Sequence, residues 1–404
     1  MPSVKELVCG ALVLTFCECT AYAQLPPQRF EAGKGNLRLG PVRIHPFFAL
    51  GELFDSNVFL QPTDTQSDFI TVISPGLILN LPVKQHQFTL GYRADILEFA
   101  RLTQENTVNH TGQFRAEAHY AGGWSWYVED QPLRTTERPN TEFDPLIERT
   151  QNNGALGTEY RLADRWAVGA DYLNVYYDYD NFPPPEDYGT QLNRIEQYGS
   201  GDLYYLLQPK TALIGEFTYG DIAYINDGTA TVRNNVNYFG RVGIRGRVTS
   251  KLTTTAKLGY QAKLFDNPTQ KDFDGFVATG EIDYQPTDWT LLTLLFDRST
   301  QEASYLVEGD DFYINNSVTL TVEHVLKSNE KVRGFVSATY ANADYVVSPR
   351  NDNFYAASTA LSYQIQDWVG VSLQYLFARR DSTGTPFDFD YTDNRVFLRC
   401  LVGL

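Results

Sequence analysis

Hydrophobic and polar positions alternate along most of the chain. In residues 276–284, Phe276 and Tyr284 lie on one face of an extended segment, whereas Glu281 and Asp283 lie on the other. A polar turn and a second apolar run follow directly. A period of two that is interrupted by turn residues predicts a β-hairpin, and hairpins of this kind fill the chain.

The alternating segments between residues 47 and 404 number about 18, and each has at least the roughly 9–11 residues that a tilted transmembrane strand needs. Short connections such as "GG", "SK" and "QD" alternate with long polar ones such as "ERPNTEFDPLIER" and "NFPPPEDYGTQLN". Outer-membrane barrels have short periplasmic turns and longer extracellular loops, whereas a soluble sandwich has no reason to sort its connections. We therefore predict an all-β fold, a transmembrane antiparallel β-barrel.

The two faces of each strand then have different surroundings. Backbone groups find no water in a bilayer, so strands cross it only as a closed ladder. We expect the apolar face of residues 276–284 to contact lipid, and Glu281 and Asp283 to face a polar lumen. Residues 289–296 are apolar on both faces, so their register stays open.

The tryptophans follow short turns. The chain has five of them: Trp124, Trp126, Trp166, Trp289 and Trp368. Indole rings favour the membrane–water interface, where the ring is half in lipid and the N–H stays in water. We therefore predict an aromatic girdle at the periplasmic rim of the barrel.

The N-terminal residues have the features of an export signal. Lys5 precedes an apolar run from Leu7 to Phe16, and Ala21-Tyr22-Ala23 forms an A-x-A-type cleavage site. These features predict a signal peptide over residues 1–23, cleaved near Ala23.

Residues 24–46 are then expected to form a periplasmic lead or a partial plug, and residues 47–404 the outer-membrane barrel. Cys400 is the one cysteine that lies outside the predicted signal peptide. An intrachain disulfide is therefore not expected in the mature protein.

Composition and charge exclude several classes of function. The formal net charge is -16, which argues against nucleic acid as a partner, because a binder of its backbone needs a basic stripe. No cysteine or histidine spacing indicates zinc, and no glycine-rich loop opens a helix. We expect neither an enzyme nor a cofactor. Acidic clusters such as Asp310-Asp311 leave calcium open, although polar loops commonly have this composition.

Charged residues on the lumen-facing parity form the main candidate site. The basic members are Arg241, Arg245, Arg247, Lys257, Lys263 and Arg333, with Glu281 and Asp283 among the carboxylates on the same interior. Two interpretations stay open. The charges either neutralise one another across the wall, or form a selectivity surface for anionic or hydroxyl-rich solutes.

Two early segments resemble a known family. "GELFDSNVFL" (residues 51–60) and "SDFITVISPGLILNLP" (residues 67–82) are similar to the start of the Putative beta-barrel porin 2 family. The motif residues are Phe54, Asp55, Ser56, Asn57, Val58 and Phe59. The resemblance implies an outer-membrane export channel of about 18 strands that accompanies exopolysaccharide or capsule synthesis, without catalytic residues. Asp55 and Asn57 would lie at the outer end of the first strand and order the loop there.

We therefore expect a channel in the outer membrane of a Gram-negative bacterium, with passive export of exopolysaccharide or capsular polysaccharide as the favoured function. The alternatives are a diffusion porin for small polar solutes and a plugged structural or adhesive protein. The expected partners are outer-membrane lipids and lipopolysaccharide, the barrel-assembly machinery, the polysaccharide and periplasmic export components.

Overall fold

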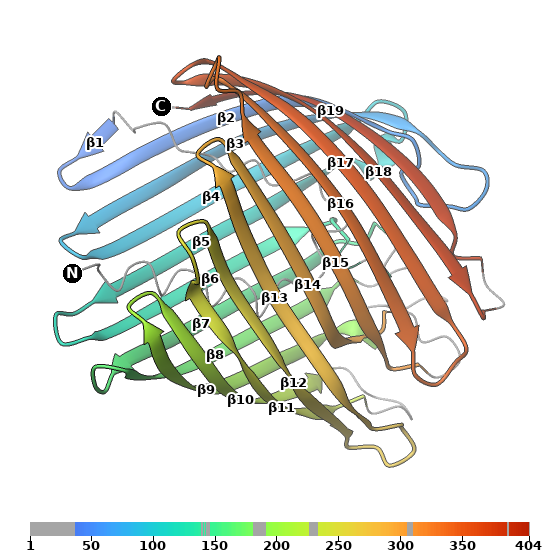
Figure 1. Cartoon of the computed structure of the whole chain (residues 1–404). Helices are drawn as coiled ribbons and strands as arrows, with labels where there is room; N and C mark the ends of the chain where they lie inside the picture. The colour runs from blue at the N-terminus through green and yellow to red at the C-terminus, as the bar shows by residue number, and fades with distance from the viewer. Residues whose placement is uncertain are drawn as a thin grey trace.

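The computed structural model describes residues 37–138, 140, 142, 146–180, 191–225, 233–304, 310–385 and 388–403. Nearly all of the regular structure is β (Figure 1). The strands are β1 (Leu37–Leu39), β2 (Val42–Asp55), β3 (Asp68–Val83), β4 (His86–Phe99), β5 (Thr107–His119), β6 (Trp124–Thr135), β7 (Arg149–Arg161), β8 (Trp166–Tyr179), β9 (Arg194–Gln208), β10 (Thr211–Tyr224), β11 (Asn235–Arg247), β12 (Leu252–Phe265), β13 (Phe273–Thr287), β14 (Thr290–Glu302), β15 (Phe312–Val325), β16 (Val332–Tyr345), β17 (Asn351–Gln366), β18 (Val369–Thr383) and β19 (Tyr391–Gly403).

Strands β2 to β19 form one closed antiparallel barrel. Each strand pairs with the next in the sequence, and β19 pairs with β2, with Cys400 opposite Leu50. These 18 strands confirm the predicted fold. The short β1 only extends β2 as a hairpin, with Leu37 opposite Ile44.

The connections are sorted by length between the two rims. Figure 1 shows the tight hairpins gathered at one rim, where β2 begins and β19 ends, and the longer connections at the other. We call these the short-turn rim and the long-loop rim. No helix among the described residues is long and apolar enough to span a membrane.

The two faces of the wall follow the predicted alternation. Phe276 and Tyr284 are about half exposed on the outside, whereas Val277 faces inward and is buried. The register left open by the sequence is also resolved, because Phe296 lies opposite Gly280 and shares its outward face. A Cβ on Gly280 would lie 2.5 Å from the Phe296 ring, so glycine makes room for that ring.

The first barrel strand begins earlier than predicted. β2 starts at Val42 rather than at residue 47, because residues 43–46 pair with β3, as in Arg43 opposite Asn80. Residues 1–36 lie outside the described residues, so the signal peptide and the partial plug remain predictions.

All five tryptophans lie at the short-turn rim. Trp124, Trp126 and Trp166 occupy the first residues of β6 and β8 on the outward parity. Trp289 and Trp368 directly precede β14 and β18. This placement is compatible with a girdle at one interface of the membrane, which remains a prediction.

Candidate functional site

Four of the six predicted basic residues line the lumen side of two neighbouring strands. These four are Arg241 and Arg245 on β11 and Lys257 and Lys263 on β12. Arg247 lies exposed at the short-turn end of β11 and donates to the carbonyl of Ser250. Arg333 also lies near the short-turn rim, on β16 and away from these strands. We call the four the β11–β12 cations.

These cations are paired with carboxylates from the neighbouring wall. Arg241 Nε lies 2.9 Å from Glu216 Oε1, although the geometry is not that of an aligned hydrogen bond. Lys257 Nζ donates to the other oxygen of Glu216. Arg245 donates to Glu159 Oε2 at 2.7 Å. Buried charges need such partners, since desolvation alone is costly. The structure therefore favours mutual neutralisation over an open basic surface.

The guanidinium groups also cover nearby aromatic rings. The Arg245 guanidinium lies 3.9 Å from the centre of the Tyr204 ring, and that of Arg241 lies 4.6 Å from the centre of the Phe239 ring. Such cation–π contacts stabilise the wall. They also cover one face of each of these two rings.

The two predicted carboxylates on β13 also face inward. Asp283 Oδ1 accepts a hydrogen bond of 2.6 Å from Thr293 on β14. Glu281 lies opposite Thr255 of β12 and Leu295 of β14. Their contacts belong to the short-turn half of the wall.

The connection between β6 and β7, residues 136–148, contributes a buried acidic side chain. Glu142 is only 2% exposed. Its Oε1 accepts from the Tyr345 hydroxyl at 2.8 Å and lies 3.6 Å from Arg350, and its Oε2 accepts from the backbone N–H of Ser304 at 2.5 Å. Burial raises the pKa of the Glu142 carboxyl, while Arg350 opposes that shift.

This connection, which we call the crossing loop, reaches the far side of the barrel. The strands follow the ring in sequence order, so β6 and β7 lie roughly opposite β15–β17. Arg380 of β18 donates to the backbone carbonyl of Glu142 at 3.2 Å. Near the start of the loop, Arg138 donates to the Val58 carbonyl at 2.7 Å. The described part of the crossing loop therefore narrows the lumen at the long-loop rim.

The alternation of apolar and polar residues did not predict this anchor. Glu142, Arg350 and Arg380 lie in or beside segments that were interpreted only as polar outer loops. One signal was present, because Leu146 and Ile147 form an apolar pair in an otherwise polar connection. Ile147 is 4% exposed and Leu146 packs against the cluster around Val58, so this apolar pair is what holds the end of the loop inside.

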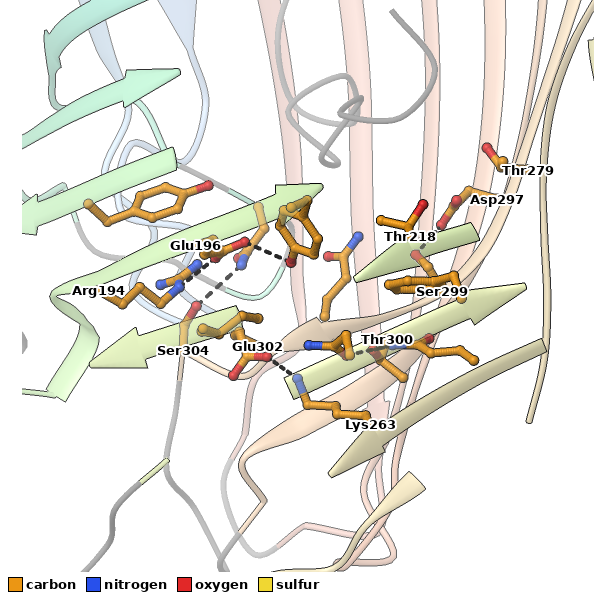
Figure 2. A pocket seen from close by; sticks show the side chains of 18 of the residues that line it. Arg194, Glu196, Thr218, Lys263, Thr279, Asp297, Ser299, Thr300, Glu302 and Ser304 are labelled. Atoms are coloured by element: carbon orange, nitrogen blue, oxygen red, sulfur yellow. Dashed lines mark hydrogen bonds and ion pairs between the residues drawn. The ribbon is translucent and has the colours of Figure 1, made fainter. Parts of the chain in front are cut away.

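A cavity of about 150 Å³ lies beside the crossing loop, on the wall formed by β8–β14. Figure 2 shows two ion pairs along it, Arg194 with Glu196 and Lys263 with Glu302. Its hydroxyl- and amide-bearing lining consists of Asn140, Tyr177, Tyr179, Tyr198, Thr218, Asn237, Gln261, Thr279, Ser299, Thr300, Gln301 and Ser304.

The next part of the wall, β15–β17, adjoins β14 and carries short side chains instead. Thr321, Ser337 and Ser358 lie side by side across β15, β16 and β17 on the inward face. Thr319 and Thr339 form a second such pair, with their hydroxyls 2.8 Å apart. Long paired side chains thus fill the β8–β14 side of the lumen, and small hydroxyl-bearing residues line the β15–β17 side.

The family motif lies at the seam where the barrel closes. Arg395 of β19 lies 3.0 Å from Asp55 Oδ2, and the Ser56 hydroxyl donates to Asp393 at 3.0 Å. Asn57 donates to the carbonyl of Thr392 at 3.2 Å, which ties the following loop to β19.

The apolar motif residues pack at the same rim. Phe54 contacts the ring of Phe69, with 5.0 Å between the ring centroids. Val58 is buried, and Phe59 packs against the cluster that contains it. The motif therefore orders the end of the first barrel strand, where the resemblance placed it.

The acidic clusters that left calcium open are engaged with protein groups. Asp310 accepts from the backbone N–H groups of Val347 and Ser348, and Asp393 lies 2.6 Å from Arg395. Within the described ranges, no group of three or more His, Cys, Asp or Glu side chains could hold a metal ion.

Comparisons with known proteins agree with this architecture. The family model described as Putative beta-barrel porin 2 matches residues 33–402. A comparison with curated protein sequences gave no match.

Several solved structures have a similar fold. The outer membrane protein OpdK of Pseudomonas aeruginosa is 11% identical, with a TM-score of 0.47, over 89% of this chain and 99% of that one. OpdO of the same organism is 12% identical, with a TM-score of 0.49, over 89% and 97%. OccAB3 of Acinetobacter baumannii is 8% identical, with a TM-score of 0.45, over 91% and 100%.

Proposed function

The chain belongs to the Putative beta-barrel porin 2 family, and from that premise we propose that it is a passive diffusion channel for small polar solutes. It is an outer-membrane β-barrel porin, in the outer membrane of a Gram-negative bacterium. The proposed transport follows the concentration gradient and involves no reaction. Lipids, lipopolysaccharide and the barrel-assembly machinery are its proposed partners.

The observation that carries this proposal is the anchored crossing loop. Glu142 is held by three groups around its carboxylate and by Arg380 at its carbonyl. Breaking a buried ion pair by removal of one partner costs about 3–5 kcal/mol, so the anchor resists displacement. A lumen that the crossing loop narrows is suited to the passage of single small solutes.

Export of polysaccharide, favoured by the sequence resemblance, fits this lumen less well. Every segment of a hydrated polymer would have to pass the crossing loop during export. The charged wall also offers little to an acidic polymer, because Glu216 and Glu159 already pair with Arg241, Lys257 and Arg245. We therefore favour the alternative function, a diffusion porin for small polar solutes, over polysaccharide export.

Liposome swelling with purified protein tests the proposal. Wild-type protein should admit arabinose several-fold faster than the trisaccharide raffinose. Glu142→Ala should release the crossing loop and raise both the raffinose rate and the single-channel conductance. Glu148→Ala is the matched control, because Glu148 belongs to the same loop but pairs with the exposed Arg134 at its base.

Three results would contradict the proposal. Equal entry of both sugars into wild-type liposomes would show that the path is not narrow. A native strain that lacks the protein, loses surface polysaccharide and keeps normal solute uptake would restore the export function. A folded barrel without measurable conductance would favour a plugged structural protein.

A further inference from the structure

We propose that the cavity beside the crossing loop binds neutral, hydroxyl-rich solutes of about the size of one monosaccharide. This inference rests on the proposed porin function, since it names the class of solute for that channel. It is carried by two buried polar side chains, Gln261 and Thr218. Each has an atom without a hydrogen-bond partner among the described residues, and both line the cavity.

A chain of amides determines the orientation of Gln261. Asn235 donates from Nδ2 to the backbone carbonyl of Arg233 at 3.0 Å, so its Oδ1 must accept. Asn237 donates to that oxygen at 2.8 Å, and Gln261 in turn donates to Asn237 Oδ1 at 2.9 Å. The Arg233 carbonyl fixes the orientation of the Asn235 amide, and each hydrogen bond then fixes the next amide in the chain.

The second N–H of the same amide is also used. Gln261 Nε2 donates to the Thr300 hydroxyl at 2.7 Å. The carbonyl oxygen Oε1 is therefore an acceptor that no described donor satisfies, on a side chain that is 1% exposed. A buried acceptor without a donor is unfavourable, and a solute hydroxyl would relieve this.

Thr218 provides a complementary group. Thr218 is 3% exposed, and its hydroxyl has no hydrogen-bond partner within the described part of the chain. A threonine hydroxyl can donate and accept, as sugar hydroxyls do. Figure 2 shows Thr218, Ser299 and Thr300 among the side chains that line this cavity.

The charges along the cavity favour a neutral solute. Its lining contains three cations and three carboxylates: Arg194, Arg241, Lys263, Glu196, Asp297 and Glu302. Arg194 pairs with Glu196 at 2.7 Å, and Asp297 accepts from Ser299 at 2.6 Å. An ionic solute would have to displace one of these partners, whereas a hydroxyl group need not.

The volume of the cavity limits the size of the solute. The cavity measures about 150 Å³, below the roughly 300–1,000 Å³ of pockets that enclose drug-sized ligands. One sugar ring, partly in the open lumen, matches this space better than a long chain.

Planar-bilayer recordings test the site with glucose, the anion gluconate and the cation glucosamine, which are similar in size. Glucose should block the current more strongly than either ion. Thr218→Val keeps the side-chain shape and breaks no described hydrogen bond, so it should weaken glucose block about tenfold without loss of folding. Thr255→Val is the control, because Thr255 is buried on the same inward face but does not line the cavity. Gln261→Leu should act like Thr218→Val, with Gln374→Leu on β18 as its control.

The outcomes separate this site from the channel. Normal conductance with equal glucose block in wild type, Thr218→Val and Thr255→Val would overturn the site and leave the porin function standing. Stronger block by gluconate would overturn the neutral preference. If the barrel does not conduct, saturation-transfer NMR in detergent still measures glucose binding. Binding that Thr218→Val removes would then sustain the site and reject the porin, and absence of binding would overturn the site.

Discussion

At the residue scale, Glu216 is the central carboxylate of the lumen wall. It is 9% exposed and lies between two cations, Arg241 at 2.9 Å from one oxygen and Lys257 on the other. Burial of these three charges is favourable only while they compensate one another. The β11–β12 cations are therefore part of the structure of the wall before they can act on a solute.

Glu216→Gln should consequently destabilise the barrel by about 3–5 kcal/mol, because two buried cations lose their shared counter-charge. The folded band on unboiled SDS gels should convert to the unfolded band at a lower temperature. Glu323→Gln, at an exposed inward position of β15, should leave that temperature unchanged. An equal effect of both substitutions would show that the pairing in the wall contributes little.

At the element scale, closure depends on the pairing of β2 with β19. Asn57 is 1% exposed and reaches beyond the last residue of β2. It accepts from the backbone N–H of Gln61 at 2.9 Å and donates to the carbonyls of Gln61 and Thr392. One side chain thus orders a loop and joins it to the strand that completes the ring.

Asn57→Ala should remove all three hydrogen bonds, each of which contributes about 0.5–1.5 kcal/mol. We expect slower barrel assembly into liposomes and earlier protease cleavage after residue 55. Asn329→Ala, in an exposed short turn, is the control. Unchanged assembly and cleavage for Asn57→Ala would mean that strand pairing alone closes the barrel.

At the scale of the whole molecule, the lumen is asymmetric. Paired long side chains fill the wall from β8 to β14, and the small residues Thr321, Ser337 and Ser358 line the adjoining strands β15–β17. The crossing loop joins the β2–β3 connection and β18 at the long-loop rim. The permeation path should therefore follow β15–β17.

Ser358→Phe should narrow this path and lower the single-channel conductance at least twofold, since a ring would replace a hydroxymethyl group on the small-residue wall. Thr359→Phe places the same ring on the outward, exposed face of β17 and should leave the conductance unchanged. If Thr359→Phe lowers the conductance as much, the effect arises from the strand and not from the path.

The sequence by itself determined the architecture of this protein. Alternation at period two predicts the face of each side chain, because successive residues on a strand point to opposite sides. The even number of strands, the sorted connections and the position of Trp124 or Trp166 followed from the same local rules. The apolar run of residues 289–296 was the exception, since alternation is absent there and only pairing with β13 sets its register.

The tertiary structure alone decided what the lumen contains. The alternation of side chains along each strand predicted that Arg241 and Lys257 face the lumen. It could not identify Glu216 as their common partner, because that contact depends on the stagger between neighbouring strands. The burial of Glu142 against Tyr345, 203 residues later, is set by the curvature that brings opposite walls of the ring within reach of one loop. Neither contact partner can be identified from the local sequence, and both contacts follow from closure of the barrel.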